Sequence, residues 1–324
     1  MPDLSAELTL RPAMIDDAEA VADAATALRP DDPMDPLILR HHWLARDRGD
    51  VVQRFAVLAG GRVVGACTQA HSDWAKVETR YGRVEVILRP DVRSEAALTW
   101  AFDRIEDRSR EDGTEILRTW GRDDDTQLLD LLARRGYRVD RRQRYWELDL
   151  AASRERVLQE TNVARARMAA QGVRLLTLAD DEHPERHRQL YELDAEGDQD
   201  VPSTVPYVPQ SFDVFMKWFD DPALHPDRLW IAREGDRIVG LSVLAYPPIR
   251  GHVSTQWTTT LRSVRGRGIA RALKLETLTQ ALALGIERVR TDNDSQNAPI
   301  LHINEQLGYH RITGATSLIK PAWN

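Results

Sequence analysis

The stretch Val264-Arg265-Gly266-Arg267-Gly268-Ile269-Ala270 decides how this chain folds, because regular structure is expected on both sides of it. Before it, Trp257–Leu261 is rich in β-branched residues, which favour a strand. After it, apolar residues recur at three- or four-residue steps as far as Leu284, which predicts a helix with one buried stripe. Ile286–Thr291 then returns to a strand-like pattern. The order strand, glycine loop, helix, strand is typical of an α/β protein.

The two glycines of this loop indicate an anion-binding site. Gly266 and Gly268 carry no side chains, so a ligand can approach the main chain closely. N–H groups at the start of a helix attract negative charge, and Arg265 and Arg267 add full positive charges. The pattern therefore predicts a site for a phosphate or pyrophosphate. It lacks the Gly-Lys-Ser/Thr of a P-loop, and it resembles a dinucleotide fingerprint only weakly, because that fingerprint opens a longer series of strands.

Landmarks recur along the chain at nearly constant spacing. Two hairpin patterns, each apolar–turn–apolar, end at Gly65 and Gly240. The interval between these two glycines is nearly the same as the interval that separates Gly136-Tyr137 from Gly308-Tyr309. A shared order with shared spacing predicts a duplicated domain.

The repeats divide the chain of 324 residues into two units. We expect residues 1–150 and 173–324 to form these units. Residues 151–172 are predicted to form a solvent-facing linker helix that is capped by Ser153 and ended by Gly172.

Two motifs of the second unit resemble the GNAT-type N-acetyltransferase superfamily. Arg265–Ala270 matches the family loop Q/R-x-x-G-x-G/A, and Asn297–Tyr309 is similar to the family's closing motif, an Asn followed by a helix and then Gly-aromatic. The spacing between the two motifs is also that of the family. The resemblance implies an α/β (α+β) fold of two tandem GNAT-like domains, each a central mixed, mostly antiparallel twisted sheet flanked by helices. This tandem architecture is similar to that of mycothiol synthase.

By the same resemblance, the second unit binds acetyl-CoA as a co-substrate and is an acyltransferase. The strand ending at Leu261 would bind the pantetheine arm, and a main-chain N–H of Thr259 or Thr260 would polarise the thioester carbonyl. The resemblance implies these cofactor-binding residues: Leu261, Val264, Arg265, Gly266, Arg267, Gly268, Ile269, Ala270, Arg271, Asn293 and Asn297. The acetyl group would pass to a primary amine of a small molecule by direct attack in a ternary complex.

The candidate proton-transferring groups depart from the family pattern. Many relatives carry a Tyr seven residues after the motif Asn, where this chain has Asn304, an amide that cannot give up a proton; Tyr309 is a weak substitute. Glu196 and Asp198 lie in an acidic stretch that also contains Asp200, and one of these carboxylates would accept the amine's proton. Together they favour a cationic amine, although a merely solvated acidic loop is the alternative.

The composition and a few single residues limit the classes of partner that this protein could bind. The net charge of −7 argues against nucleic acid, and no apolar run is long enough for a membrane helix. The acidic N-terminal residues 1–7 lack an apolar signal region, so a cytoplasmic location is expected. The expected oligomeric state is a monomer or a homodimer. Cys67 is expected to be a buried structural residue, and His183 and His187 do not match a zinc pattern, so no metal is predicted.

The first unit has lost the glycine loop. At the spacing of the repeat, Arg93–Leu98 corresponds to Arg265–Ala270 and contains Glu95 but neither glycine, and Asp125 stands opposite Asn297. Side chains and carboxylates there would exclude a pyrophosphate. We therefore expect a degenerate GNAT-like unit that supports the fold, makes a dimer contact or walls the active half. Two alternatives to the amine acetyltransferase stay open, namely a non-catalytic acyl-CoA-binding regulatory or interaction protein and an enzyme that transfers a longer acyl group.

Overall fold

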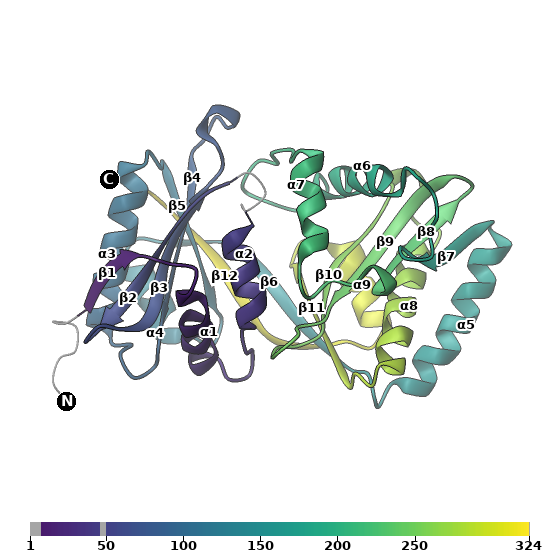
Figure 1. Cartoon of the computed structure of the whole chain (residues 1–324), viewed down its shortest axis with the longest axis horizontal. Helices are drawn as coiled ribbons and strands as arrows, with labels where there is room; N and C mark the ends of the chain where they lie inside the picture. The colour runs from purple at the N-terminus through teal and green to yellow at the C-terminus, as the bar shows by residue number, and fades with distance from the viewer. Residues whose placement is uncertain (1–7, 46–49, 324) are drawn as a thin grey trace.

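In the part of the chain that the structure describes, twelve strands form one continuous sheet with helices packed on it (Figure 1). The structure is a computed structural model that describes residues 8–45 and 50–323; the N-terminal stretch 1–7, on which the expected lack of a signal rests, lies outside them. The strand order is β1-β2-β3-β4-β5-β12-β6-β11-β10-β9-β8-β7. Among the strands of the described residues, only the neighbours β4–β5 and β10–β11 are parallel. The sheet is therefore mixed and mostly antiparallel, as predicted.

The elements of the two halves follow the same order. The first half contains β1 (Leu8–Pro12), α1 (Asp17–Leu28), α2 (Pro36–Leu44), β2 (Val51–Ala59), β3 (Arg62–His71), β4 (Tyr81–Leu88), α3 (Glu95–Glu111), β5 (Ile116–Arg122), α4 (Thr126–Arg134) and β6 (Arg138–Asp149). After α5 (Arg154–Ala170), the second half contains β7 (Val173–Thr177), α6 (Arg186–Asp198), α7 (Phe212–Met216), β8 (Leu229–Glu234), β9 (Arg237–Ala245), β10 (Ser254–Thr260), α8 (Ile269–Ala283), β11 (Arg288–Asp294), α9 (Ala298–Gln306) and β12 (His310–Pro321). The bounds of β5, α4 and β6 return as those of β11, α9 and β12, all shifted by the interval that separates Gly136 from Gly308. The predicted tandem fold is confirmed.

The halves exchange their last strands. β6 of the first half lies between β12 and β11, and pairs with β11 from Arg288↔Asp149 to Asp294↔Gln143. In return, β12 pairs with β5, from Ala315↔Arg122 to Pro321↔Ile116. Each half therefore completes its sheet with a strand of the other half, which joins the two expected sheets into one.

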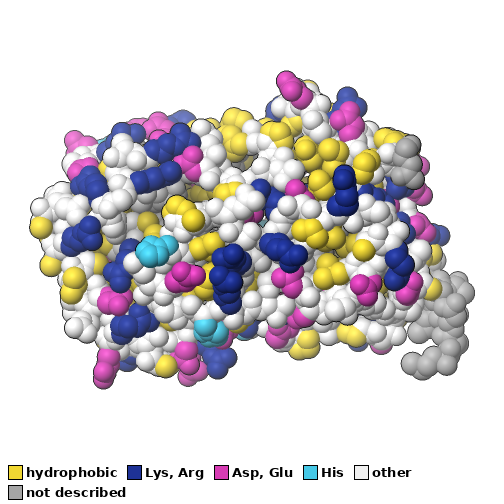
Figure 2. All heavy atoms as spheres, turned by 180° about the vertical axis from the view of Figure 1, so that it is seen from behind, with side chains coloured by type: hydrophobic (Ala, Val, Ile, Leu, Met, Phe, Trp, Pro, Cys, Tyr) yellow, Lys and Arg dark blue, Asp and Glu magenta, His cyan; other side chains and the backbone are white. Residues whose placement is uncertain are grey.

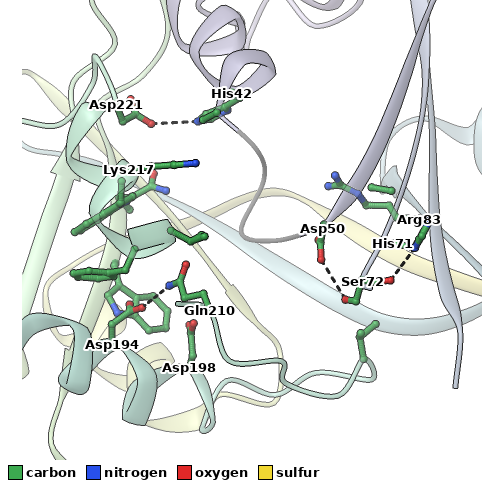
Figure 3. A pocket seen from close by; sticks show the side chains of 18 of the residues that line it. His42, Asp50, His71, Ser72, Arg83, Asp194, Asp198, Gln210, Lys217 and Asp221 are labelled. Carbon is green, nitrogen blue, oxygen red and sulfur yellow. Dashed lines mark hydrogen bonds and ion pairs between the residues drawn. The ribbon is translucent and has the colours of Figure 1, made fainter. Parts of the chain in front are cut away.

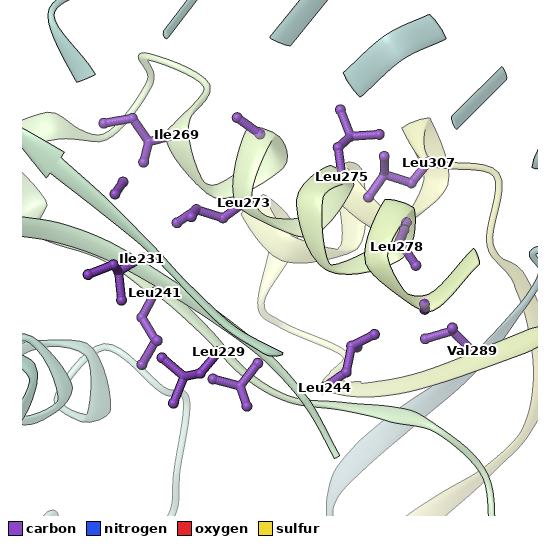
Figure 4. Close-up of a cluster of buried hydrophobic side chains, with 14 of the residues drawn as sticks. Leu229, Ile231, Leu241, Leu244, Ile269, Leu273, Leu275, Leu278, Val289 and Leu307 are labelled. Carbon is purple, nitrogen blue, oxygen red and sulfur yellow. The ribbon is translucent and has the colours of Figure 1, made fainter. Parts of the chain in front are cut away.

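The core of the second half lies between the sheet and the helix that follows the glycine loop. Ile269 and Leu273 of α8 lie over Ile231 and Leu241 of the sheet (Figure 4). Gly240 of β9 allows this close approach, since a Cβ there would stand 2.9 Å from Leu273 and 3.0 Å from Ile269. The apolar stripe predicted from the sequence is thus buried, and it fixes the start of α8 against the sheet.

The connecting helix α5 packs on α8 rather than facing solvent all round. Its buried residues, Val157, Thr161, Ala164 and Met168, recur at steps of three and four residues. Arg165 on the same helix donates two hydrogen bonds to Glu276, at 2.6 and 2.7 Å. The polar composition of the segment hid this stripe, because only one narrow face of the helix is covered.

One lysine of α8 is buried, and no carboxylate among the residues that the structure describes forms an ion pair with it. Lys274 is 1% exposed, donates to Thr255 Oγ1 at 3.2 Å, and lies 5.4 Å from the centre of the Tyr309 ring. Burial lowers its pKa to about 7, whereas an unfolded lysine titrates near about 10.4.

This buried lysine predicts a pH dependence of stability. Between about pH 7 and pH 10 the unfolded state binds more protons than the folded state, so Lys274 makes the free energy of unfolding rise with pH, by at most about 1.4 kcal/mol per pH unit. Lys274→Met is expected to be more stable than the parent near pH 7, with an advantage that shrinks toward pH 10. Urea unfolding of both proteins across this range measures the difference, and a constant difference would contradict the assignment.

The surface and the single thiol agree with their sequence-based descriptions. Basic and acidic side chains are interspersed on the face seen in Figure 2 rather than gathered by sign. None of the helices within residues 8–45 and 50–323 has the length and apolar character needed to cross a membrane. Cys67 is fully buried, and burial raises its pKa to about 12, so the thiol is unreactive.

Candidate functional site

Strands β10 and β11 diverge, and this opening is the centre of the candidate site. They are paired only at Ser254↔Arg290 and separate beyond it (Figure 1). At the end of β10 the Leu261 N–H donates to Val239 O at 3.1 Å, toward β9. Because main-chain groups alternate along an antiparallel strand, the N–H of Thr259 is also directed to β9, and that of Thr260 is directed into the opening.

The glycine loop follows the open end of β10. Gly266 and Gly268 have φ angles of +77° and +91°, and Gly268 is the N-cap of α8. No atom lies within 4 Å of where a Cβ on Gly266 would stand. The loop thus leaves open space at the N-terminus of a fifteen-residue helix, which is the arrangement that binds anions.

The remaining residues of the predicted cofactor-binding set differ in which of their groups a ligand could contact. Val264 and Ile269 are buried, and Ala270 is half-buried. The N–H and carbonyl of Leu261 are both used, by Val239 and Val264. Any contribution of these residues to a ligand therefore comes from the main chain of the loop, not from their side chains.

The arginines around the loop are paired with carboxylates of neighbouring elements. Asp200, just after α6, accepts from Arg262 at 2.7 Å and from Arg265 at 2.5 Å. Hydrogen bonds from Arg262 and then Arg265 lower the pKa of Asp200 to about 2. Arg267 pairs with Glu234 at 2.9 Å, and Arg271 pairs with Glu160 of α5 at 2.8 Å. The positive charges predicted here are present, and each of them is held by an acid.

The connecting helix also reaches the loop, which the sequence did not indicate. The guanidinium of Arg167 lies 3.4 Å from the position of a Cβ on Gly268. Gln171 accepts from Arg267 Nε at 3.1 Å. The C-terminal end of α5 therefore forms one side of the loop.

A cavity of about 450 Å³ opens between the two halves, next to β10 (Figure 3). The second half contributes residues of α6, the segment after it and β10; the first half contributes residues of α2, β3, β4 and β5. Gln256 and Trp257 of β10 are part of its wall, together with residues of α6, the helix that packs against β10. The first half thus forms part of this wall.

The three acidic residues singled out in the sequence separate in the structure. Asp198 of α6 lines the cavity. Glu196 instead accepts the N–H of Arg262 at 2.5 Å, at the end of β10, and Asp200 holds the arginines described above. The sequence reasoning missed Asp194, which lies one turn before Asp198 on the same cavity wall and accepts from Gln210 at 3.1 Å. The sequence pattern that indicates Asp194 is its spacing of four residues from Asp198, which places both side chains on one face of the helix.

The polar residues of the closing motif lie near β11. Asn304 is fully buried and donates to Asn293 Oδ1 at 2.7 Å, while Asn297 is the half-buried N-cap of α9. Tyr309 is buried in the core, where burial raises the pKa of its hydroxyl. A proton leaves such a hydroxyl less readily than a solvated one, so this placement does not favour Tyr309 as a general acid.

The corresponding loop of the first half has a different local structure. Ser94 caps α3 by accepting the Ala97 N–H at 3.1 Å, so its side chain occupies the helix N-terminus. Arg93 pairs with Asp125, the N-cap of α4, at 2.6 Å. A helix start already filled by its own side chain leaves less room for a ligand anion than the start of α8.

Within the described residues, no group of three or more potential metal-ligating side chains is found.

A protein-family model matches most of the second half of the chain. Residues 177–309 match the model described as the acetyltransferase (GNAT) family. No curated protein sequence is similar enough to this chain to count as a match.

Solved structures match almost the whole chain. A tandem GNAT protein from the clavulanic acid biosynthesis pathway has a TM-score of 0.74 at 17% identity, with 98% of this chain and 99% of that chain covered. A GCN5-related N-acetyltransferase from Sphaerobacter thermophilus has a TM-score of 0.66 at 19% identity, with 98% and 96% covered. At these identities the likeness establishes the tandem fold.

Proposed function

We propose that this protein acetylates a primary amine of a small molecule with acetyl-CoA. The match of residues 177–309 to the acetyltransferase (GNAT) family model supports acyl transfer from acyl-CoA. In the proposal, residues 173–324 bind the co-substrate and carry the reaction, while residues 1–150 do not bind acetyl-CoA. Residues 151–172 connect them.

The observation that carries the proposal is the open main chain at Gly266, next to Gly268 at the start of α8. Both glycines have positive φ, and a Cβ on Gly266 would project into empty space at the N-terminus of α8. This open space fits a pyrophosphate, because it combines unshielded N–H groups with the positive end of a helix. Arg265, Arg267 and Arg271 surround the loop and would balance the charge of the ligand.

The acetyl thioester would supply an activated acyl carbon, and the chain's residues would orient and assist the attack. The Thr260 N–H would donate to the carbonyl oxygen, where negative charge develops. Asp198 or Asp194 would take a proton from the ammonium form of the acceptor. The amine nitrogen then bonds to the acyl carbon as the carbon–sulfur bond breaks. A thiol pKa of about 8.5 lets the sulfur leave as thiolate, and the second amine proton neutralises it or passes to water.

A thiol-release assay with acetyl-CoA and a panel of small primary amines tests this function. We expect amine-dependent release of CoA and an acetylated product of the matching mass. Binding of acetyl-CoA without turnover of any amine would instead support the non-catalytic acyl-CoA-binding role. Asn304 in place of a motif tyrosine, and the buried hydroxyl of Tyr309, are the observations that favour this second candidate.

Asp200→Asn is expected to tighten the binding of acetyl-CoA about threefold to tenfold, because the exposed ion pairs with Arg262 and Arg265 must loosen before those arginines can contact a phosphate. Because the pKa of Asp200 is about 2, its carboxylate is ionised at any pH used for the assay. Isothermal titration measures the change. Asp227→Asn, which removes an exposed carboxylate paired with Arg228 instead, should leave the affinity unchanged. Weaker binding by Asp200→Asn would show that Asp200 positions the arginines rather than competing for them.

A further inference from the structure

Two arginines of the first half lie side by side in the wall of the cavity. Arg83 of β4 and Arg118 of β5 are direct register partners in the parallel pair, at the last position before these strands separate. Both line the cavity (Figure 3 labels Arg83). Partners on neighbouring strands point to the same side of a sheet, so two positive charges meet at one point of the wall.

These two charges are poorly neutralised by the protein itself. The buried Nε of Arg118 has no hydrogen-bond partner, and no carboxylate among residues 8–45 and 50–323 lies within 4.0 Å of its guanidinium. Arg83 has Glu85 at 3.6 Å. Burial, and then the charge of Arg83, lower the pKa of Arg118, while Asp140, Glu85 and Asp50 act on it only from a longer range. Like charges placed directly opposite on adjacent strands destabilise a sheet, so a bound anion would relieve this arrangement.

The opposite wall of the same cavity contains several carboxylates and one lysine, Lys217. Asp194 and Asp198 of α6 face the cavity across from Arg83 (Figure 3), and Trp257 of β10 lies in the wall as well. An amine held by these carboxylates would lie on the β10 side, where the proposed reaction takes place. The arginine pair would then meet the other end of the same molecule.

We propose that Arg83 and Arg118 form an oxyanion subsite for the acceptor, so that the acceptor is an amine whose far end carries a carboxylate or a phosphate. The inference rests on the proposed acetyltransferase function and specifies its substrate class. Two adjacent guanidiniums suit either oxyanion, because each presents a planar fork of N–H donors. The first half, which has lost the glycine loop, would thus select the acceptor.

Matched acceptors test the subsite through turnover. The probes are ω-aminocarboxylates of four to seven carbons, diamines of the same lengths and ω-aminoalkyl phosphates. We expect aminocarboxylates or aminoalkyl phosphates to exceed the diamines at least tenfold in kcat/KM, and the better of the two identifies the oxyanion. Arg118→Met and Arg83→Met should abolish this preference through KM, with the KM for acetyl-CoA unchanged. Lys217→Met removes a cavity charge outside the pair and should keep the preference. Equal loss in Lys217→Met, or a preference for diamines, would overturn the proposal.

A binding measurement separates failure of the subsite from failure of the proposed function. Glutarate and inorganic phosphate are added to the full-length protein, and Tm is followed. Either anion should raise the Tm of the parent and of Lys217→Met but not of Arg118→Met. Ligand-free Arg118→Met should also unfold at a higher temperature than the parent, because one of two adjacent like charges is gone. If no amine is acetylated but these shifts appear, the subsite stands and the acetyltransferase function falls. If neither anion shifts the Tm of the parent, the subsite is refuted.

Discussion

Gly268→Glu is expected to raise the Kd for acetyl-CoA at least a hundredfold while the protein remains folded. Gly268 has a φ of +91° and caps α8, so a glutamate there begins at the helix N-terminus, with its Cβ 3.4 Å from the Arg167 guanidinium. Its carboxylate would neutralise the positive groups at this end of the helix and repel the charge of a pyrophosphate. A negative charge at a helix N-terminus also favours the helix, which offsets part of the backbone strain. Isothermal titration with acetyl-CoA measures the loss.

The matched control lies at the other end of the same helix. Gly285 follows α8 with a φ of +78°, and no atom lies within 4 Å of a Cβ placed on it. Gly285→Glu introduces the same side chain at the same kind of backbone strain, about 1 kcal/mol, but far from the loop. Its Kd should match that of the parent. Unchanged affinity in Gly268→Glu, or equal losses in both variants, would remove the basis for the proposed function.

Local patterns were sufficient to predict several elements of both halves. The glycine loop, the stripe of α8 and the two hairpins that contain Gly65 and Gly240 depend on residues close in sequence, and the structure has them where the sequence indicated. The duplication was also readable, because it needs only a repeated spacing. These features share one property, namely that each is decided by neighbours along the chain.

The exchange of β6 and β12 could not be predicted in this way. The two strands are equivalent in the repeat, and each could pair within its own half or across to the other. Their sequences favour a strand in both cases, so the choice depends on the length and direction of α5 and on contacts between residues far apart. Pattern reasoning has no access to either.

The acceptor side of the site was missed for the same reason. Asp194 was within reach, since it lies four residues before Asp198 on one helix. Arg83 and Arg118 could not be found in this way, because they belong to separate strands and only the pairing of β4 with β5 brings them together. Only the exchange of strands brings these residues to the cavity beside β10.

Thr260→Pro is expected to lower kcat about a hundredfold to a thousandfold, which is the usual effect of removing one main-chain donor from a developing negative charge. The N–H of Thr260 is directed into the opening between β10 and β11, so proline removes that donor without removing a ladder hydrogen bond. Thr259, the preceding residue, is already in an extended strand, as a residue before proline must be. Steady-state kinetics with a saturating amine measure kcat.

Thr259→Pro is the informative partner of this variant, because the neighbouring N–H is directed to β9 and belongs to the sheet. It should lose thermal stability through the broken ladder, whereas Thr260→Pro should keep most of its Tm. The two substitutions differ by one position and change the same residue type, so the alternation of the strand alone decides which property is lost. If Thr260→Pro kept its kcat while remaining folded, no donor at the end of β10 would act on the thioester, and the stabilising group would have to be sought elsewhere in the opening.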